Sequence, residues 1–153
     1  MVDVAPSLCR VKVHLTLAVT GIVIGISSFL VFGLKFQNWH AGSWGLVSGV
    51  FATLTLYVHI QYMREIWKTW TYRLKYFIII GCSCMLVAIV GFVAYVTLGA
   101  VFHQDLHPNG HNYYLASIWC FMAWKWAFLL FWFSRRYRAL YGDEYRLPAY
   151  EHI

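Results

Sequence analysis

Two ionisable side chains inside long apolar segments are the first candidates for chemistry in this sequence. His59 and Lys125 each lie within such a segment. A charge at the centre of a membrane helix costs about 2.5 kcal/mol or more, so each side chain must face protein or water. The purely structural alternatives are a hydrogen bond from His59 to a neighbouring helix and a snorkelling side chain for Lys125. Tyr62 follows His59 at helical spacing, so both project from one helix face.

Three histidines lie in the polar stretch between the last two apolar segments: His103, His107 and His111. Neutral imidazole is a common protein ligand for zinc and for heme iron, and a loop can bring ligands together without helical spacing. The Pro-Asn-Gly sequence at 108–110 favours a chain reversal between the last two histidines. A hydrated loop without any ligand role is the alternative interpretation.

Aromatic and cationic side chains lie together where the last apolar segment ends, in the run Phe133, Ser134, Arg135, Arg136 and Tyr137. Anchoring at lipid headgroups would explain this run without a ligand. A ligand that suits it is a flat aromatic macrocycle that carries carboxylates and a metal ion. Aromatic rings pack on its faces, arginine pairs with its carboxylates, and histidine or tyrosine coordinates the metal.

The elements that position these side chains are predicted to be helices in a lipid bilayer. With 61% hydrophobic and 12% charged residues, the chain of 153 residues lies outside the range of soluble domains. A spanning helix needs roughly 20 mainly apolar residues. Four segments qualify, approximately 13–34, 44–63, 76–102 and 113–134. We therefore expect an all-α integral membrane protein, a single transmembrane domain over 1–153 with a tail at 135–153.

Two glycine pairs indicate how the first two helices pack. Gly21 with Gly25, and Gly45 with Gly49, have the spacing that allows membrane helices to approach closely. The first apolar run is also about twice as long as the apolar region of a secretory signal, so we expect a membrane helix there.

The basic residues are distributed unevenly and predict the orientation. They precede the first segment (Arg10, Lys12), separate the second from the third (Arg64, Lys68, Arg73, Lys75) and follow the fourth (Arg135, Arg136, Arg138, Arg146). Because cytoplasmic loops collect Lys and Arg, both termini are predicted to be cytosolic. Anionic lipid on the cytosolic side explains the net charge of +6, and no nucleic-acid partner is indicated.

Several longer stretches share a family pattern. They are Tyr113 to Trp119, Lys125 to Leu130, Arg136 to Arg138, the patterns His59-x-x-Tyr62-Met63 and Trp67-x-Thr69-Trp70, and the pair His103-Gln104. Through them the sequence resembles the heme-responsive-gene family of eukaryotic heme transporters. The resemblance covers most of residues 44–138, and the four-helix topology agrees with it.

The resemblance implies a noncatalytic protein that carries heme, its transported substrate, from the exoplasmic or luminal side to the cytosol. By position it implies that His59 and His103 bind the heme iron transiently, with Tyr62 as the alternative ligand to His59. The family's Phe-Ala-Arg-Lys-Tyr motif falls on Phe133 to Tyr137, where Ser134 and Arg136 depart from it. His107 and His111 have no assured family counterpart, and we expect them to be additional or substitute capture ligands.

Together these features predict a relay for heme. Loop histidines capture heme, which passes near His59 and Lys125 and leaves past Tyr137 and the arginines. Four helices enclose little space for such a ligand, which favours a homodimer or larger homo-oligomer.

Two alternatives from other classes remain open. A membrane heme-binding electron carrier would need two axial ligands on facing helices, whereas only His59 lies deep and His14 lies near a helix end. A non-transporting trafficking or scaffold protein is the other. Tyrosine-based sorting patterns at Tyr137 to Leu140 and Tyr150 to Ile153 are compatible with a plasma membrane or an endosomal or lysosomal membrane.

Overall fold

Within residues 7–66, 69, 71–107 and 110–144, which a computed structural model describes, the regular structure is entirely helical. The elements are α1 (Leu8–Ser28), a π-helical continuation η1 (Phe29–Lys35), α2 (Trp39–Met63), a short 3₁₀ turn η2 (Thr71–Arg73), α4 (Leu74–Val101) and α5 (Tyr113–Glu144). Four helices are long and apolar enough to cross a membrane. The predicted all-α membrane fold is thereby confirmed. Some residues named above lie outside the described residues: Trp67, Trp70, the Pro108-Asn109 pair, and residues 145–153 with Arg146 and the Tyr150 pattern.

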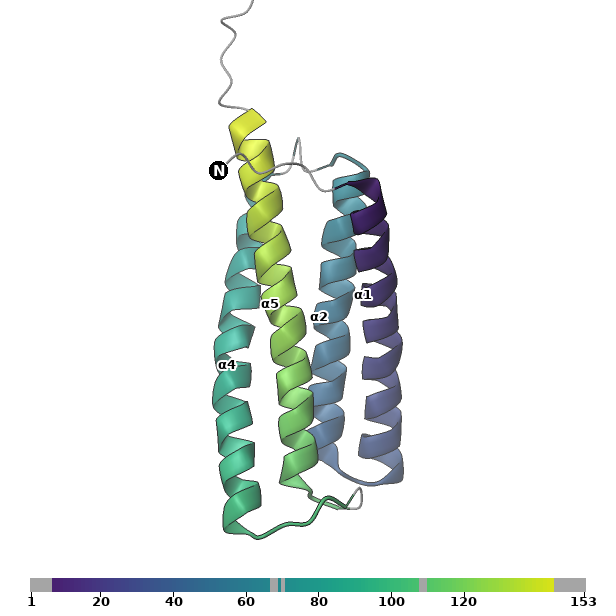
Figure 1. Ribbon diagram of the computed structural model, residues 1–153, viewed down its shortest axis with the longest axis vertical. Coiled ribbons are helices and arrows are strands. Elements are labelled where there is room, and N and C mark those ends of the chain that lie inside the picture. Colours follow the sequence, from purple (N-terminus) through teal and green to yellow (C-terminus); the bar gives the residue numbers. More distant parts are fainter. Residues whose placement is uncertain (1–6, 67–68, 70, 108–109, 145–153) are drawn as a thin grey trace, which may run out of the picture.

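The four long helices lie side by side in the order α1, α2, α5 and α4 (Figure 1). α2 packs against both α1 and α5, and α5 packs against α4. α1 begins and α5 ends at the same end of the bundle, which we call the terminal end (Figure 1). The opposite end, with the connections 36–38 and 102–112, is the loop end. Each helix therefore has one terminus at the terminal end and the other at the loop end.

The helices extend beyond the apolar segments that predict them. α1 begins at Leu8, and α5 continues past Ser134 to Glu144. Hydropathy measures the part of a helix that lies in hydrocarbon, whereas backbone hydrogen bonding continues into the headgroup region. As a result Arg135, Arg136 and Tyr137 occupy successive positions on a helix and not in an irregular tail.

Small residues allow α1 and α2 to approach closely toward the loop end. A Cβ atom on Gly25 would lie 2.6 Å from the Cα atom of Gly49, and one on Gly45 would collide with the hydroxyl of Ser28. Gly21 lies instead beneath the indole of Trp126 from α5. Both predicted glycine pairs thus take part in close contacts, although Gly21 accommodates a side chain of a different helix.

The buried core and the exposed faces are divided unequally among the helices. Only 11% of the most apolar part of α4 is buried, against 50% for α2. α2 and α5 form the centre of the bundle and carry most of the buried polar side chains, while α4 offers most of its surface to lipid or to another chain.

Candidate functional site

His59 lies in the last part of α2, at the terminal end, and is completely buried. Its Nδ1 atom is 2.8 Å from the phenol oxygen of Tyr137 on α5, which is 1% exposed. The other ring nitrogen, Nε2, is buried and has no hydrogen-bond partner among the described residues. A buried polar atom without a partner is costly, so this nitrogen is the strongest sign of a ligand site in the described structure.

Aromatic rings from three helices surround His59. The ring of His14, on α1, lies nearly parallel to it at a centroid distance of 5.6 Å, and Phe133 on α5 meets it edge-on at 4.5 Å. Tyr62, one turn beyond His59 on α2, stacks on Tyr137 at 4.2 Å. We call these five residues, His14, His59, Tyr62, Phe133 and Tyr137, the terminal cluster.

The hydrogen bond between His59 and Tyr137 determines what the imidazole can do. When Nδ1–H donates to the phenol oxygen, Nε2 presents a lone pair, which is the form that coordinates a metal. Metal-binding histidines generally have their second nitrogen held in this way. The terminal cluster is thus suited to one imidazole–iron bond with aromatic rings on the sides.

Cations lie beside the terminal cluster. Arg136 is half-buried and interacts electrostatically with His14 and with Tyr62. Arg135, its neighbour on α5, is exposed. Guanidinium groups at this level of the bundle can pair bidentately with carboxylates of a ligand whose metal meets His59.

The predicted tyrosine-based sorting pattern at Tyr137 to Leu140 is not accessible in the structure. Tyr137 is buried in a helix, with its hydroxyl at His59. A peptide motif that is read by a partner must be exposed and extended, so this helical segment does not present one in the described structure.

Lys125 lies far from the terminal cluster. Its Nζ atom is 4.8 Å from the centroid of the Trp126 ring, and the side chain is partly exposed on α5. Tyr137 is about 18 Å further along the same helix, at 1.5 Å per residue. None of the four spans contains an aspartate or glutamate, so no acid within them can neutralise this charge.

The loop histidines do not gather into one site. His103 and His107 are exposed and make no ring contact with each other or with His111 among the described residues. No group of three or more His, Cys, Asp or Glu residues suited to a metal ion occurs in the part of the chain that is described. His111 contacts instead His40, at the start of α2, with ring centroids 5.6 Å apart.

Sequence reasoning did not include His40 among the candidate residues, and it considered His14 only as a residue near a helix end. His40 also accepts or donates a hydrogen bond at Nδ1 with the hydroxyl of Tyr95, at 3.1 Å. The alternating direction of successive helices could have indicated both residues, because the end of one helix lies at the same end of the bundle as the beginning of the next. On that basis His14 shares an end with His59, and His40 shares one with the loop 102–112.

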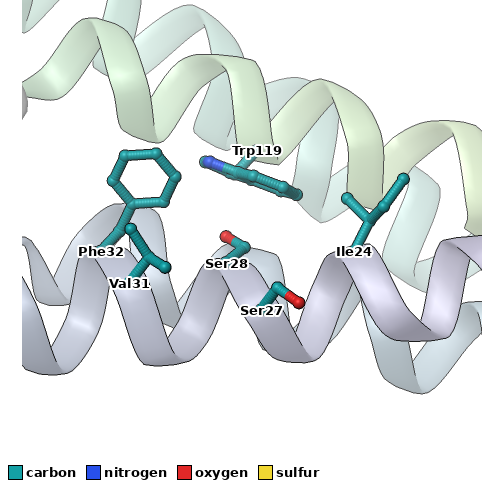
Figure 2. A pocket seen from close by; sticks show the side chains of 6 residues that line it. All are labelled: Ile24, Ser27, Ser28, Val31, Phe32 and Trp119. Carbon is teal, nitrogen blue, oxygen red and sulfur yellow. The ribbon is translucent and has the colours of Figure 1, made fainter.

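A pocket between α1, η1 and α5 lies apart from the terminal cluster. It has a volume of about 250 Å³ and is lined by Ile24, Ser27, Ser28, Val31, Phe32 and Trp119, with the indole of Trp119 above Ser28 (Figure 2). Typical ligand pockets are about 300–1,000 Å³. Because it lacks imidazole and cationic groups as well, this groove does not extend the candidate site.

Comparisons with known proteins identify the family of the chain. Residues 74–126 match the family described as "Haem-transporter, endosomal/lysosomal, haem-responsive gene". The "Heme transporter hrg-1" of Caenorhabditis elegans is 31% identical over 142 residues, covering 90% of this chain and 73% of the relative. The "Heme transporter hrg-4" of the same organism is 25% identical over 150 residues, covering 85% and 82%. No solved structure matches the chain significantly. From the identity and coverage of the first relative, the chain belongs to the heme-responsive-gene family of heme transporters.

Proposed function

We propose that this chain moves heme from the exoplasmic or luminal side of a membrane to the cytosol and catalyses no reaction. The observation that carries the proposal is the buried, unpartnered Nε2 atom of His59, whose ring is held at Nδ1 by Tyr137. Membership of a family of heme transporters supplies the substrate.

The direction rests on charge. The terminal end carries Arg135, Arg136, and Arg10 and Lys12 near the beginning of α1, whereas the connection 102–112 at the loop end has no Lys or Arg. By the positive-inside rule the terminal end is cytosolic and the loop end faces outward. His59 then lies on the cytosolic side of the pathway and the loop histidines lie at its entrance.

The route begins at the loop end. His103, His107 and His111 are exposed and can each offer one imidazole to heme iron. Lys125 lies between the two ends and offers an uncompensated cation to a propionate. Release at every step requires weak, exchangeable contacts, and single ligands satisfy this better than two strong axial ligands.

Access to His59 requires movement. The imidazole is completely buried, with His14 on one face and Phe133 at the edge. Heme therefore reaches Nε2 only when these rings move aside. The close glycine contacts join α1 and α2 toward the loop end, so displacement of α1 near His14 is the least obstructed movement. Tyr62, stacked on Tyr137, is the alternative ligand to His59 and becomes available through the same opening.

Heme leaves the pathway beside the arginines of α5. Arg135 and Arg136 lie one turn or less from Phe133 and Tyr137, the α5 residues of the terminal cluster, and Phe133 provides a ring surface for the macrocycle. The mostly exposed α4 supports a homodimer or larger homo-oligomer, in which a second chain encloses the pathway. The membrane is either the plasma membrane or an endosomal or lysosomal membrane.

Growth of a heme-auxotrophic yeast on limiting hemin tests the proposal. Cells that express the wild-type chain should grow, and cells that express His59→Ala should not, because the variant lacks the proposed iron ligand. Leu46→Ala is the matched control, since Leu46 is an exposed apolar residue on the same helix.

Protein amounts in the membrane must be compared by immunoblot. Equal growth with the wild type, His59→Ala and the empty vector would rule out heme transport by this chain. A tightly retained, reducible heme spectrum in the purified protein would favour the electron carrier instead.

A further inference from the structure

A second histidine pair, at the loop end, is independent of the terminal cluster. His40 and His111 come from α2 and from the residues before α5, and their rings meet at 64° with centroids 5.6 Å apart. Apart from the bond between His40 Nδ1 and Tyr95, neither ring makes a hydrogen bond among the described residues. The two imidazoles thus meet at an angle, and three of their four ring nitrogens make no hydrogen bond among the described residues.

The loop backbone holds His111 in place. Its carbonyl oxygen accepts a hydrogen bond from Gln104 Nε2 at 2.9 Å, and Gln104 Oε1 accepts one from the backbone N–H of Tyr113. On its two sides, Gly110 N–H donates to the Phe36 carbonyl, and the carbonyl of Asn112 accepts from the buried amide of Asn38. The connection 102–112 is therefore joined to the connection 36–38 by hydrogen bonds that hold the backbone of His111 near the start of α2.

Tyr95 orients the imidazole of His40. Its hydroxyl bonds to His40 Nδ1 at 3.1 Å, which leaves Nε2 as the free nitrogen. Tyr113 packs near His40 at 5.9 Å and stacks on Tyr95 at 6.1 Å, so the tyrosine is itself supported. A ligand imidazole whose other nitrogen is hydrogen-bonded is the usual arrangement at a metal site.

The separation of the rings matches two ligands of one metal ion. With metal–nitrogen bonds of about 2.0–2.1 Å in tetrahedral geometry, imidazole centroids lie about 5 Å apart. To bind both imidazoles, heme iron would have to coordinate one on each face of its macrocycle. The edge-on contact between the two rings leaves no space for a porphyrin between them. An uncomplexed ion is thus the better fit.

We propose that His40 and His111 form a two-imidazole site for a divalent transition-metal ion such as Zn²⁺, with Tyr95 as the residue that positions His40. Imidazole suits Zn²⁺, Cu²⁺ and Ni²⁺. No third His, Cys, Asp or Glu joins the pair among the described residues, so water completes the coordination at the exposed side. The positive end of the α2 dipole also disfavours a cation there, which makes the bound ion exchangeable. Zinc binding at this pair can be measured without heme, although His111 is also one of the proposed capture ligands.

Calorimetric titration of the purified full-length protein with ZnCl₂ in detergent tests this site. The wild type should show saturable binding and a rise in Tm with zinc, because an ion that binds only the folded state stabilises it. His111→Ala should lose both, and so should His40→Ala. Tyr95→Phe should bind about tenfold more weakly, the typical effect of removing a group that orients a ligand.

His107→Ala is the matched control, because it removes an exposed histidine of the same loop that does not contact the pair. Zinc binding should be unchanged in this variant. Circular dichroism and the hemin spectrum at His59 report whether each variant is folded. Zinc binding that survives in His111→Ala, or its absence in the wild type, would overturn the site, as would a requirement for His40 in hemin binding alone.

Discussion

The Nδ1 atom of His59 lies 2.8 Å from the hydroxyl of Tyr137, across the contact between α2 and α5. These residues are 78 positions apart in the chain, and both are essentially inaccessible to solvent. The pair joins the resemblance's helix-two histidine to the last residue of its C-terminal motif. Two features that are separate in the sequence are thus parts of one ligand site in our proposal, and they need to be tested together.

Removing only the hydroxyl of Tyr137 tests that coupling. Tyr137→Phe keeps the aromatic ring and its stacking on Tyr62 but frees His59 Nδ1. We expect hemin affinity, measured from the Soret band of the purified protein, to fall about 10- to 100-fold, as when a group that orients a metal ligand is lost. Tyr114→Phe, at the loop end, is the control. An unchanged affinity in Tyr137→Phe would mean that the hydroxyl does not orient the ligand.

Lys125 tests the middle of the route. Lys125→Met removes the charge and retains much of the apolar stem, whereas Lys125→Arg retains the charge. A hydrogen bond to a charged group contributes about 1.5–3 kcal/mol, so the methionine variant should weaken heme-dependent uptake by about 10- to 100-fold. Initial rates of hemin uptake, normalised to protein in the membrane, give the comparison. If methionine supports wild-type uptake, Lys125 has no part in carrying heme.

The contact of Gly25 with Gly49 predicts a stability effect. In Gly25→Ala the new methyl group would lie 2.6 Å from the Cα atom of Gly49, so the backbones must separate. We expect a loss of about 1–3 kcal/mol, seen as a lower thermal midpoint in detergent. Gly33→Ala is the matched control, because a Cβ there has its nearest neighbour at 3.6 Å. Equal midpoints would contradict the close helix approach.

The sequence is sufficient to predict the four spans, because the thickness of the bilayer sets the length of each apolar run. It places helix ends less well, since α1 begins at Leu8 and α5 ends at Glu144, beyond the predicted apolar segments. The burial of His59 follows from its position within a span.

Other parts of the candidate sites could not be predicted from the sequence. Nothing in the spacing indicates that Tyr137 reaches His59, because that contact depends on how far α5 continues. Likewise, composition draws attention to the loop rich in histidine, yet the partner of His111 is His40, brought there by hydrogen bonds between two loops. No local sequence pattern indicates that His40 and His111 are in contact.

Membrane orientation can be tested with the chain's own cysteine. Cys9 is exposed at the terminal end, and Leu106, which is 69% exposed, lies at the loop end. If the terminal end is cytosolic, an impermeant maleimide applied to intact cells that display the protein at their surface should not label Cys9 until the membrane is permeabilised. A variant that carries Leu106→Cys with Cys9→Ser should be labelled without permeabilisation. The opposite labelling pattern would reverse the predicted direction of transport, because the loop histidines would then face the cytosol and His59 would lie near the outer side.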